Sequence, residues 1–402
     1  MDSSAIAVDG RLGGDASLFR VPSDAGQMRP AILYPAAVLF GDGTAERVGG
    51  EARAFGSRAL LVTSGSPRGR EQDQPLGRVL RSLDDAGVQV GRFELHGEPD
   101  THAVDECAAQ AADIGAELLI GVGGGSILDL AKAASALAGN GGSWPDYQFG
   151  GATLTRASLP LVAIPTTAGT GSEATSVAVI HNRERGLIKS VSSPLMLPRV
   201  AIVDPTFTWS CPPRLTALVG LDAITHAIES YLSPRASRLT RALSLQALSL
   251  LVDPLVRAVE DGTDREARNS LALGSHFAGQ ALSAGVGAAH ILAQPISATL
   301  GVAHGEALAA IVVAVLAFNE EHPSPLFADL LPVFNSQHAS LSLAVRDYLA
   351  SIDLPTTLSA VGGRDSDIAG ILSRVAPTTG HVWTNVRPVT LPDLERILHE
   401  SI

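Results

Sequence analysis

Short apolar runs separated by helical stretches fill the first half of the sequence, and this alternation restricts the fold most strongly. The runs are RALLVT (58–63), VGRFEL (90–95), AELLIGVGGGS (116–126), LPLVAIPTT (159–167) and RVAIVDP (199–205). Strands separated by helices of about 10–15 residues are typical of βαβ units, in which the strands form a parallel sheet. The sequence therefore predicts an α/β domain built on such a sheet.

The pattern changes after Pro205. PPRLTALVGLDAITHAIESYL and nearly everything beyond it places Ala and Leu at helical spacing, and Pro212–Pro213 is a typical helix start. We predict a mobile N-terminal tail at 1–28, an α/β domain at 29–205 and an all-helical domain at 206–402.

Charge and cysteine content restrict the function. A net charge of −12 and a pI near 5.3 argue against an electrostatic nucleic-acid partner. Two cysteines, Cys107 and Cys211, suit a reducing compartment rather than a disulfide framework. The sequence shows neither a signal peptide nor an apolar run of about 18 residues. We expect a soluble cytoplasmic protein without a membrane partner.

The segment GVGGGSILDLAKAAS (121–135) follows a predicted strand and opens a helix. Gly123, Gly124 and Gly125 let the backbone approach a ligand, and the helix N-terminus favours an anion there. Ser126 can donate to a phosphate oxygen. The spacing is not G-x-G-x-x-G, so the standard dinucleotide fingerprint is absent. A tight turn without a ligand is the alternative.

A second loop of the same kind is IPTTAGTGSEATS (164–176), which offers the hydroxyls of Thr166, Thr167, Thr170 and Ser172. Short hydroxyl donors suit a pyrophosphate or a ribose, although a capped turn that begins a helix is the alternative. Two such loops at the carboxyl ends of neighbouring strands favour a dinucleotide.

The segment after the strand at 58–63 bears on the choice of dinucleotide. An acidic residue there would bind a ribose 2′-hydroxyl and repel a 2′-phosphate. The sequence instead has Ser64, Gly65 and Ser66, with Arg68 and Arg70 close by. This permits NADP(H) and mildly favours it over NAD(H), although the arginines can also be plain solvated charges.

Only two of the 29 basic residues are lysines, Lys132 and Lys189. Lys132 lies in the helix that the first loop opens, and Lys189 follows the second loop. A compact ammonium cannot always be replaced by the planar guanidinium of arginine. Both lysines are therefore candidates for positions that need a compact ammonium, and chance retention is the alternative.

Candidate metal ligands lie in the helical half. GLDAITHAIES (220–230) places Asp222 and His226 four residues apart, on one face of a helix. His290 and His304 in GAAHILAQPISATLGVAH (287–304) can complete a set of three imidazoles and one carboxylate. That set suits Fe²⁺ or Zn²⁺ with a position left for a substrate oxygen. A lone histidine is more often structural. The four candidate ligands together with the two loops are what favour a metal site.

These motifs occur in order from about residue 31 to the C-terminus, together with NVRPVT (385–390). As a set they resemble the iron-containing (group III) alcohol dehydrogenases. The resemblance implies a dehydroquinate-synthase-like fold, NAD(P) across the glycine-rich loop, a divalent metal in the interdomain cleft and a homodimer. It also implies hydride transfer between the nicotinamide and a small aldehyde or ketone, with the metal polarising the substrate oxygen.

The resemblance carries over to particular positions. The residues that match metal ligands are Asp222, His226, His290 and His304. The residues that match cofactor positions are Gly124, Gly125, Ser126, Asp129, Thr166, Thr167, Thr170 and Lys189. GEPDTHAV (97–104) resembles a further cofactor motif more weakly, through Glu98 and Pro99.

Gln294 departs from the family pattern, because many relatives have a histidine there that is thought to relay a proton. Glutamine can form hydrogen bonds but does not titrate. NVRPVT also resembles maleylacetate reductases, where the first metal ligand is often Asn; Asp222 argues for a metal-dependent member. The alternatives are a metal-independent maleylacetate-type reductase, a non-redox lyase or cyclase, and a degenerate dinucleotide-binding protein.

Overall fold

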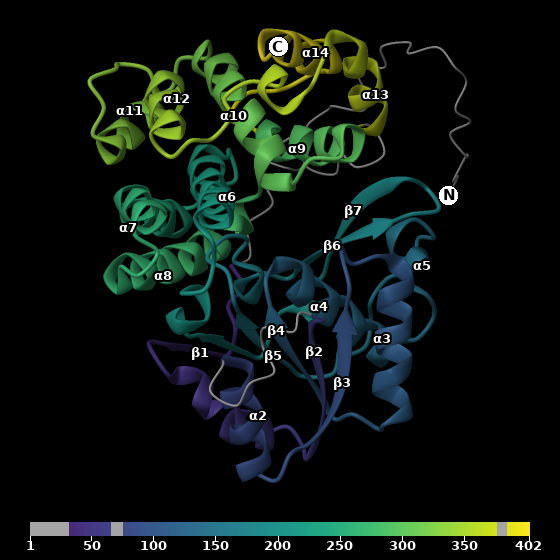
Figure 1. The fold of residues 1–402 in the computed structure, drawn as a ribbon. Coiled ribbons are helices and arrows are strands. Elements are labelled where there is room, and N and C mark those ends of the chain that lie inside the picture. The colour runs from purple at the N-terminus through teal and green to yellow at the C-terminus, as the bar shows by residue number, and fades with distance from the viewer. Residues whose placement is uncertain (1–31, 66–74, 376–383) are drawn as a thin grey trace.

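The computed structural model describes residues 32–65, 75–375 and 384–402, and it has two parts (Figure 1). The first contains a parallel sheet with helices on both faces, and the second is helical. The predicted fold class is therefore confirmed. The segment limits near residues 28 and 205 stay predictions, and the predicted tail at 1–28 lies outside the described residues.

The sheet has six strands in the order β1-β8-β5-β4-β2-β3, and each neighbouring pair is parallel. Five of the strands fall on the predicted apolar runs, whereas β1 and the antiparallel hairpin β6-β7 were not predicted. The strand bounds are β1 Ala37–Phe40, β2 Arg58–Ser64, β3 Gln89–Leu95, β4 Leu118–Gly123, β5 Leu161–Pro165, β6 Val177–Asn182, β7 Leu187–Ser192 and β8 Val200–Val203.

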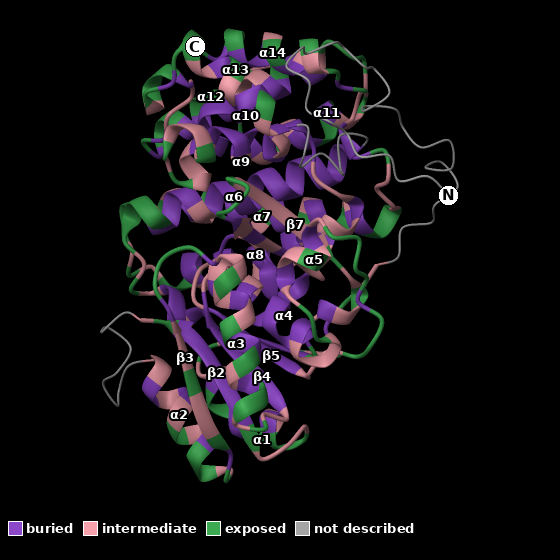
Figure 2. Cartoon of the chain, turned by 90° about the vertical axis from the view of Figure 1, so that its right-hand side faces the viewer, coloured by how far each residue is buried: buried purple, intermediate pink, exposed green. Residues whose placement is uncertain are grey.

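Successive residues of the central strands point to opposite faces, and both faces are covered (Figure 2). Leu60 and Val62 of β2 pack with α3 and α4, whereas Ala59 and Leu61 pack with α1 and α2. Burial on both faces explains the unbroken apolar runs in the sequence. The helices are α1 Val48–Arg53, α2 Pro75–Asp85, α3 Thr101–Asp113, α4 Gly125–Asn140 and α5 Trp144–Gln148.

The strand order indicates where a crevice forms at the edge of the sheet. From β2 the chain passes to β3 on one side, then crosses back to β4 on the other side and continues outwards to β5 and β8. The connections therefore change direction between β2 and β4. In open α/β sheets a crevice forms outside the carboxyl ends of the strands at such a point. The carboxyl ends of β2, at Ser64, and of β4, at Gly123, flank this crevice.

The second part is built from helices, as predicted, and its buried side chains form one continuous core. The first helix begins at Pro213, the second residue of the proline pair, and Pro212 is its N-cap. Helix α7 is long and apolar enough to cross a membrane by length and composition, and its buried face belongs to this core. The bounds are α6 Pro213–Leu232, α7 Arg238–Glu260, α8 Arg265–Ala281, α9 Ala288–Leu300, α10 His304–Glu320, α11 Leu326–Leu330, α12 Leu341–Ser351, α13 Asp365–Val375 and α14 Leu391–Glu400.

Candidate active site

The glycine-rich turn joins β4 to α4. Strand β4 ends at Gly123, Gly124 is the N-cap of α4, and the helix begins at Gly125. A Cβ atom on Gly125 would lie 2.6 Å from the Thr170 Cγ2 atom, so only glycine fits against the second loop. The turn thus presents the amino end of a long helix, with backbone N–H groups suited to a phosphate.

The second loop follows β5 and lies against this turn. The Thr166 amide donates to the Gly123 carbonyl at 3.0 Å, which ties the two loops together. Thr166, Thr167 and Thr170 are partly exposed, as donors to a ligand must be. Ser172 is buried, and its hydroxyl donates to Asp129 at 2.6 Å.

Two other sequence candidates lie close to the same crevice. The Ser126 hydroxyl donates to the Glu98 carboxylate at 3.0 Å, which brings the weaker GEPDTHAV motif to the glycine-rich turn. The Gly65 amide donates to the Leu95 carbonyl at 3.0 Å and continues the β2-β3 pairing. A Cβ on Gly65 would lie 1.9 Å from the His96 ring.

Ser66, Arg68 and Arg70 lie outside the described residues. The choice between NAD and NADP depended on them and is therefore still a prediction. Lys189 lies on β7, and its ammonium sits 4.3 Å from the centroid of the Phe149 ring. Burial, followed by the nearby Arg185 charge, lowers the pKa of Lys189.

The four predicted metal ligands come from three helices and meet at one point. Asp222 and His226 lie on α6, His290 on α9, and His304 is the first residue of α10. The Asp222 Oδ1 atom lies 3.2 Å from the His290 Nε2 atom and 3.7 Å from the Nε2 atoms of His226 and His304. The His226 and His290 rings stack at 4.2 Å.

These spacings fit a small divalent cation. Ligand atoms held about 2.1 Å from a tetrahedral metal lie about 3.4 Å from one another, close to the 3.2–3.7 Å that separate Asp222 from the three imidazoles. The ligand atoms of Asp222, His226 and His290 all lie within 4.8 Å of one another, and His304 adjoins this group through Asp222. Asp222, His226 and His290 are buried, whereas 39% of the His304 side chain is exposed. A substrate can therefore approach from the His304 side.

The charge of Asp222 suits a cation, whereas His290 must lose a proton before its Nε2 atom can bind one. Burial alone would raise the pKa of Asp222, but the three imidazoles hold it well below its usual range, so this carboxylate stays ionised. Burial lowers the pKa of His226 to about 4. Burial would also lower the pKa of His290, but hydrogen bonds with Asp222 and Glu229 raise it to about 9.

The sequence reasoning missed a second carboxylate at this centre. The Glu229 Oε2 atom accepts a hydrogen bond from the His290 Nδ1 atom at 2.6 Å, and its Oε1 atom accepts from the Ala289 amide at 2.8 Å. A Cβ on Gly287 would lie 2.7 Å from this carboxylate. With Nδ1 engaged, His290 directs Nε2 towards Asp222. The helical spacing of Glu229 from His226 was the available signal.

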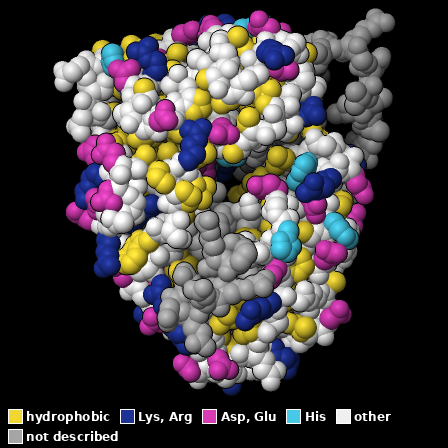
Figure 3. All heavy atoms as spheres, viewed as in Figure 1, with side chains coloured by type: hydrophobic (Ala, Val, Ile, Leu, Met, Phe, Trp, Pro, Cys, Tyr) yellow, Lys and Arg dark blue, Asp and Glu magenta, His cyan; other side chains and the backbone are white. Residues whose placement is uncertain are grey.

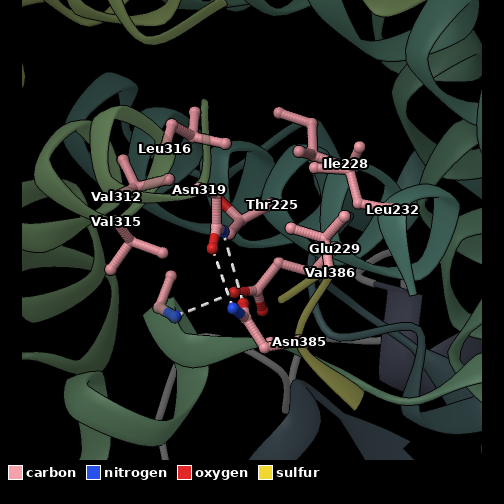
Figure 4. A pocket seen from close by; sticks show the side chains of 12 residues that line it. Thr225, Ile228, Glu229, Leu232, Val312, Val315, Leu316, Asn319, Asn385 and Val386 are labelled. Carbon is pink, nitrogen blue, oxygen red and sulfur yellow. Dashed lines mark hydrogen bonds between the residues drawn. The ribbon is translucent and has the colours of Figure 1, made fainter. Parts of the chain in front are cut away.

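Asn385 of the motif NVRPVT binds the start of α9, the helix that carries His290. The Asn385 Oδ1 atom accepts from the Ala288 amide at 3.2 Å, and its Nδ2 atom donates to the Asn319 Oδ1 atom at 2.8 Å. Figure 4 shows Glu229, Asn319 and Asn385 around one small cavity. Asn385 and Glu229 together satisfy free N–H groups at the start of α9, the helix that carries His290.

Gln294 lies on α9, one turn beyond His290, and is partly exposed. Its place near the centre and its role there stay predictions. Figure 3 shows the surface hollowed between the helical and the α/β parts.

Two family models cover nearly the whole described chain. Residues 35–205 match the model of iron-containing alcohol dehydrogenase, and residues 216–402 match the C-terminal model of that family.

Named relatives agree. Long-chain-alcohol dehydrogenase 1 of Geobacillus thermodenitrificans is 34% identical over 85% of this chain and 88% of its own length. The NAD-dependent methanol dehydrogenase of Bacillus methanolicus is 31% identical over 92% of this chain and 99% of its own. A crystal structure of 1,3-propanediol oxidoreductase superposes with a TM-score of 0.87 at 29% identity, covering 92% of this chain and 99% of that one.

Proposed function

Since the chain belongs to the iron-containing alcohol dehydrogenase family, we propose that it is a metal-dependent NAD(P)H reductase of small aldehydes or ketones. The chain is an oxidoreductase that interconverts an alcohol and its carbonyl compound by hydride transfer. The proposal adds the metal dependence, the ligand set and the cofactor contacts.

The proposed metal ligands are Asp222, His226, His290 and His304, and Fe²⁺ is favoured, with Zn²⁺ also suited to this set. A bound divalent metal supplies Lewis acidity to the substrate oxygen. The ionised Asp222 contributes the negative charge, and Glu229 holds His290 in the tautomer whose Nε2 atom faces Asp222. Gln294 offers an amide to the cleft in place of a titratable group.

The proposed cofactor contacts surround the crevice between β2 and β4. They are Ser64, Gly65, Ser66, Gly123, Gly124, Gly125, Ser126, Thr166, Thr167, Thr170 and Lys189. Asp129 and Ser172, also predicted as cofactor contacts, bind each other at 2.6 Å and would act through the loop that they hold. The amino end of α4 would hold the phosphates, and the absence of an acidic residue after β2 slightly favours NADP over NAD. We further propose a cytoplasmic homodimer that takes small-molecule substrates.

One observation carries the proposal: three imidazoles from separate helices converge on one ionised carboxylate, at spacings that suit a tetrahedral metal. Asp222 lies 68 positions from His290 and 82 positions from His304 in the sequence, so local structure alone does not produce these distances.

The decisive experiment is metal analysis of the purified protein, followed by NADH and NADPH oxidation over a panel of small aldehydes and ketoacids. We expect about one metal per chain and loss of activity after chelation, restored by Fe²⁺ or Zn²⁺. Full activity after chelation would instead support the metal-independent maleylacetate-type reductase. Turnover without net change in reduced nicotinamide would support the lyase or cyclase.

A further inference from the structure

A buried lysine lies next to the proposed dinucleotide site. The Lys132 side chain is fully buried in α4, where an unpaired charge would be strongly unfavourable. Its ammonium contacts the Asp129 Oδ1 atom at 3.0 Å, the Ser172 carbonyl at 3.1 Å and the Thr175 hydroxyl at 3.0 Å. It also donates to the Val177 carbonyl. Three of these partners belong to the segment 169–177, which covers the second half of the threonine-rich loop (164–176) and the first residue of β6.

Asp129 completes this attachment. Its Oδ1 atom accepts from the Ser172 hydroxyl at 2.6 Å, and its Oδ2 atom accepts from the Val179 amide at 2.9 Å. Both carboxylate oxygens therefore bind protein groups. The pair of Asp129 and Lys132 fastens the segment to α4, whose amino end is the proposed phosphate site.

The opposite side of the segment is fastened to the helical part. Glu173 and His276 are both buried, and the Glu173 Oε1 atom lies 3.0 Å from the His276 Nδ1 atom on α8. The Ser275 hydroxyl donates to the Gly169 carbonyl at 3.2 Å. The segment is thus held from α4 on one side and from α8 on the other.

The site also explains why a lysine remains in a chain whose other cations are nearly all arginines. Four oxygens surround a single nitrogen, which matches a compact ammonium rather than a planar guanidinium. Where this chain buries an arginine, Arg268, the guanidinium spreads its nitrogens over Thr216, Cys211 and Gly262.

We infer that Lys132 is a positioning residue for the dinucleotide. It fixes segment 169–177, and this segment holds Thr170 of the second loop against the amino end of α4. The inference rests on the proposed function. An irregular loop that is ordered before binding loses less conformational entropy when the ligand arrives. Without the ammonium, segment 169–177 is less ordered before binding. Part of the binding free energy of the dinucleotide is then spent on ordering this segment, so the affinity falls.

The test is Lys132→Met, with NADH and NADPH affinity measured by fluorescence titration on the metal-loaded protein. We expect the dissociation constant to rise at least tenfold while metal content and the circular dichroism spectrum stay unchanged. Lys132→Arg should fail to restore affinity, because charge alone does not reproduce the geometry. Arg268→Met is the matched control: it also removes a buried cation, and it should lower the unfolding temperature without weakening the dinucleotide.

A second variant guards against misfolding of the first. Thr175→Val removes one ammonium partner at nearly constant shape and should weaken the dinucleotide about two- to fivefold. Unchanged affinity in a folded Lys132→Met protein, or in Thr175→Val if the first does not fold, overturns the inference and leaves the proposed function intact. A wild-type protein that binds neither NADH nor NADPH overturns the proposed function and the inference together.

Discussion

Replacement of Glu229 by Gln tests whether this buried carboxylate holds His290 in place for a metal. Both oxygens of Glu229 accept from N–H groups, His290 Nδ1 at 2.6 Å and the Ala289 amide at 2.8 Å. A glutamine has one acceptor oxygen, so its NH₂ group would face one of these two donors. One charge-assisted bond is lost, and a donor is left facing a donor.

The expected size follows from that loss. A hydrogen bond to a charged group contributes about 1.5–3 kcal/mol, and only 6% of the Glu229 side chain is exposed, so solvent screens it little. Substitution of a group that orients a metal-ligating histidine typically weakens the metal about 10- to 100-fold. That range corresponds to about 1.4–2.8 kcal/mol, which agrees with one lost bond.

The assay is a competitive titration with a chromophoric chelator, with Zn²⁺ in air and Fe²⁺ under anaerobic conditions. Glu320→Gln is the control, because Glu320 also accepts from a backbone amide at a helix start, that of Leu341. It lies at the far end of α10 from His304, about 24 Å away along the axis. Equal metal affinity in Glu229→Gln and wild type would refute the positioning role.

Three further predictions use other sites. Gln294→His adds a titratable group one turn from His290 and should shift the pH profile of alcohol oxidation. An unchanged pH profile and rate would show that the residue at this position does not relay a proton. Arg396 and Arg387 lower the pKa of Glu321 from 4.5 to about 2, so its contribution to stability is present above pH 4.5 and is lost as the pH falls towards 2. Urea unfolding should show Glu321→Gln less stable than wild type at pH 7, with a smaller gap near pH 2; a gap that does not depend on pH would contradict this. Burial raises the pKa of the Cys107 thiol to about 12, so it should react with Ellman's reagent only after unfolding, and prompt reaction of native Cys107 would count against the buried placement.

The sequence determined the features that depend on neighbouring residues. Apolar runs placed β2, β4, β5 and β8, because strands buried on both faces of a parallel sheet carry few polar residues. The edge strand β3 was also placed, although it is only partly buried and includes Gln89, Arg92 and Glu94. The short β1 was not predicted, since four residues give little periodicity. The β6-β7 hairpin was not predicted either: burial alternates regularly along β6, but β7 is half-buried along most of its length and shows no alternation. The spacing of Asp222 and His226 likewise gave one helical face.

Tertiary structure decided which distant groups meet. His290 and Glu229 are 61 positions apart, and Lys132 and Ser172 are 40 apart. No local pattern pairs such residues, because partners for a buried charge are chosen by the packing of whole helices and loops. The sequence by itself identified the residue types that can bind a metal and a dinucleotide. Only the fold decided that Glu229 binds the His290 ring and that the two oxygens of Asp129 bind segment 169–179 of the same chain. Both arrangements depend on polar groups that are buried together.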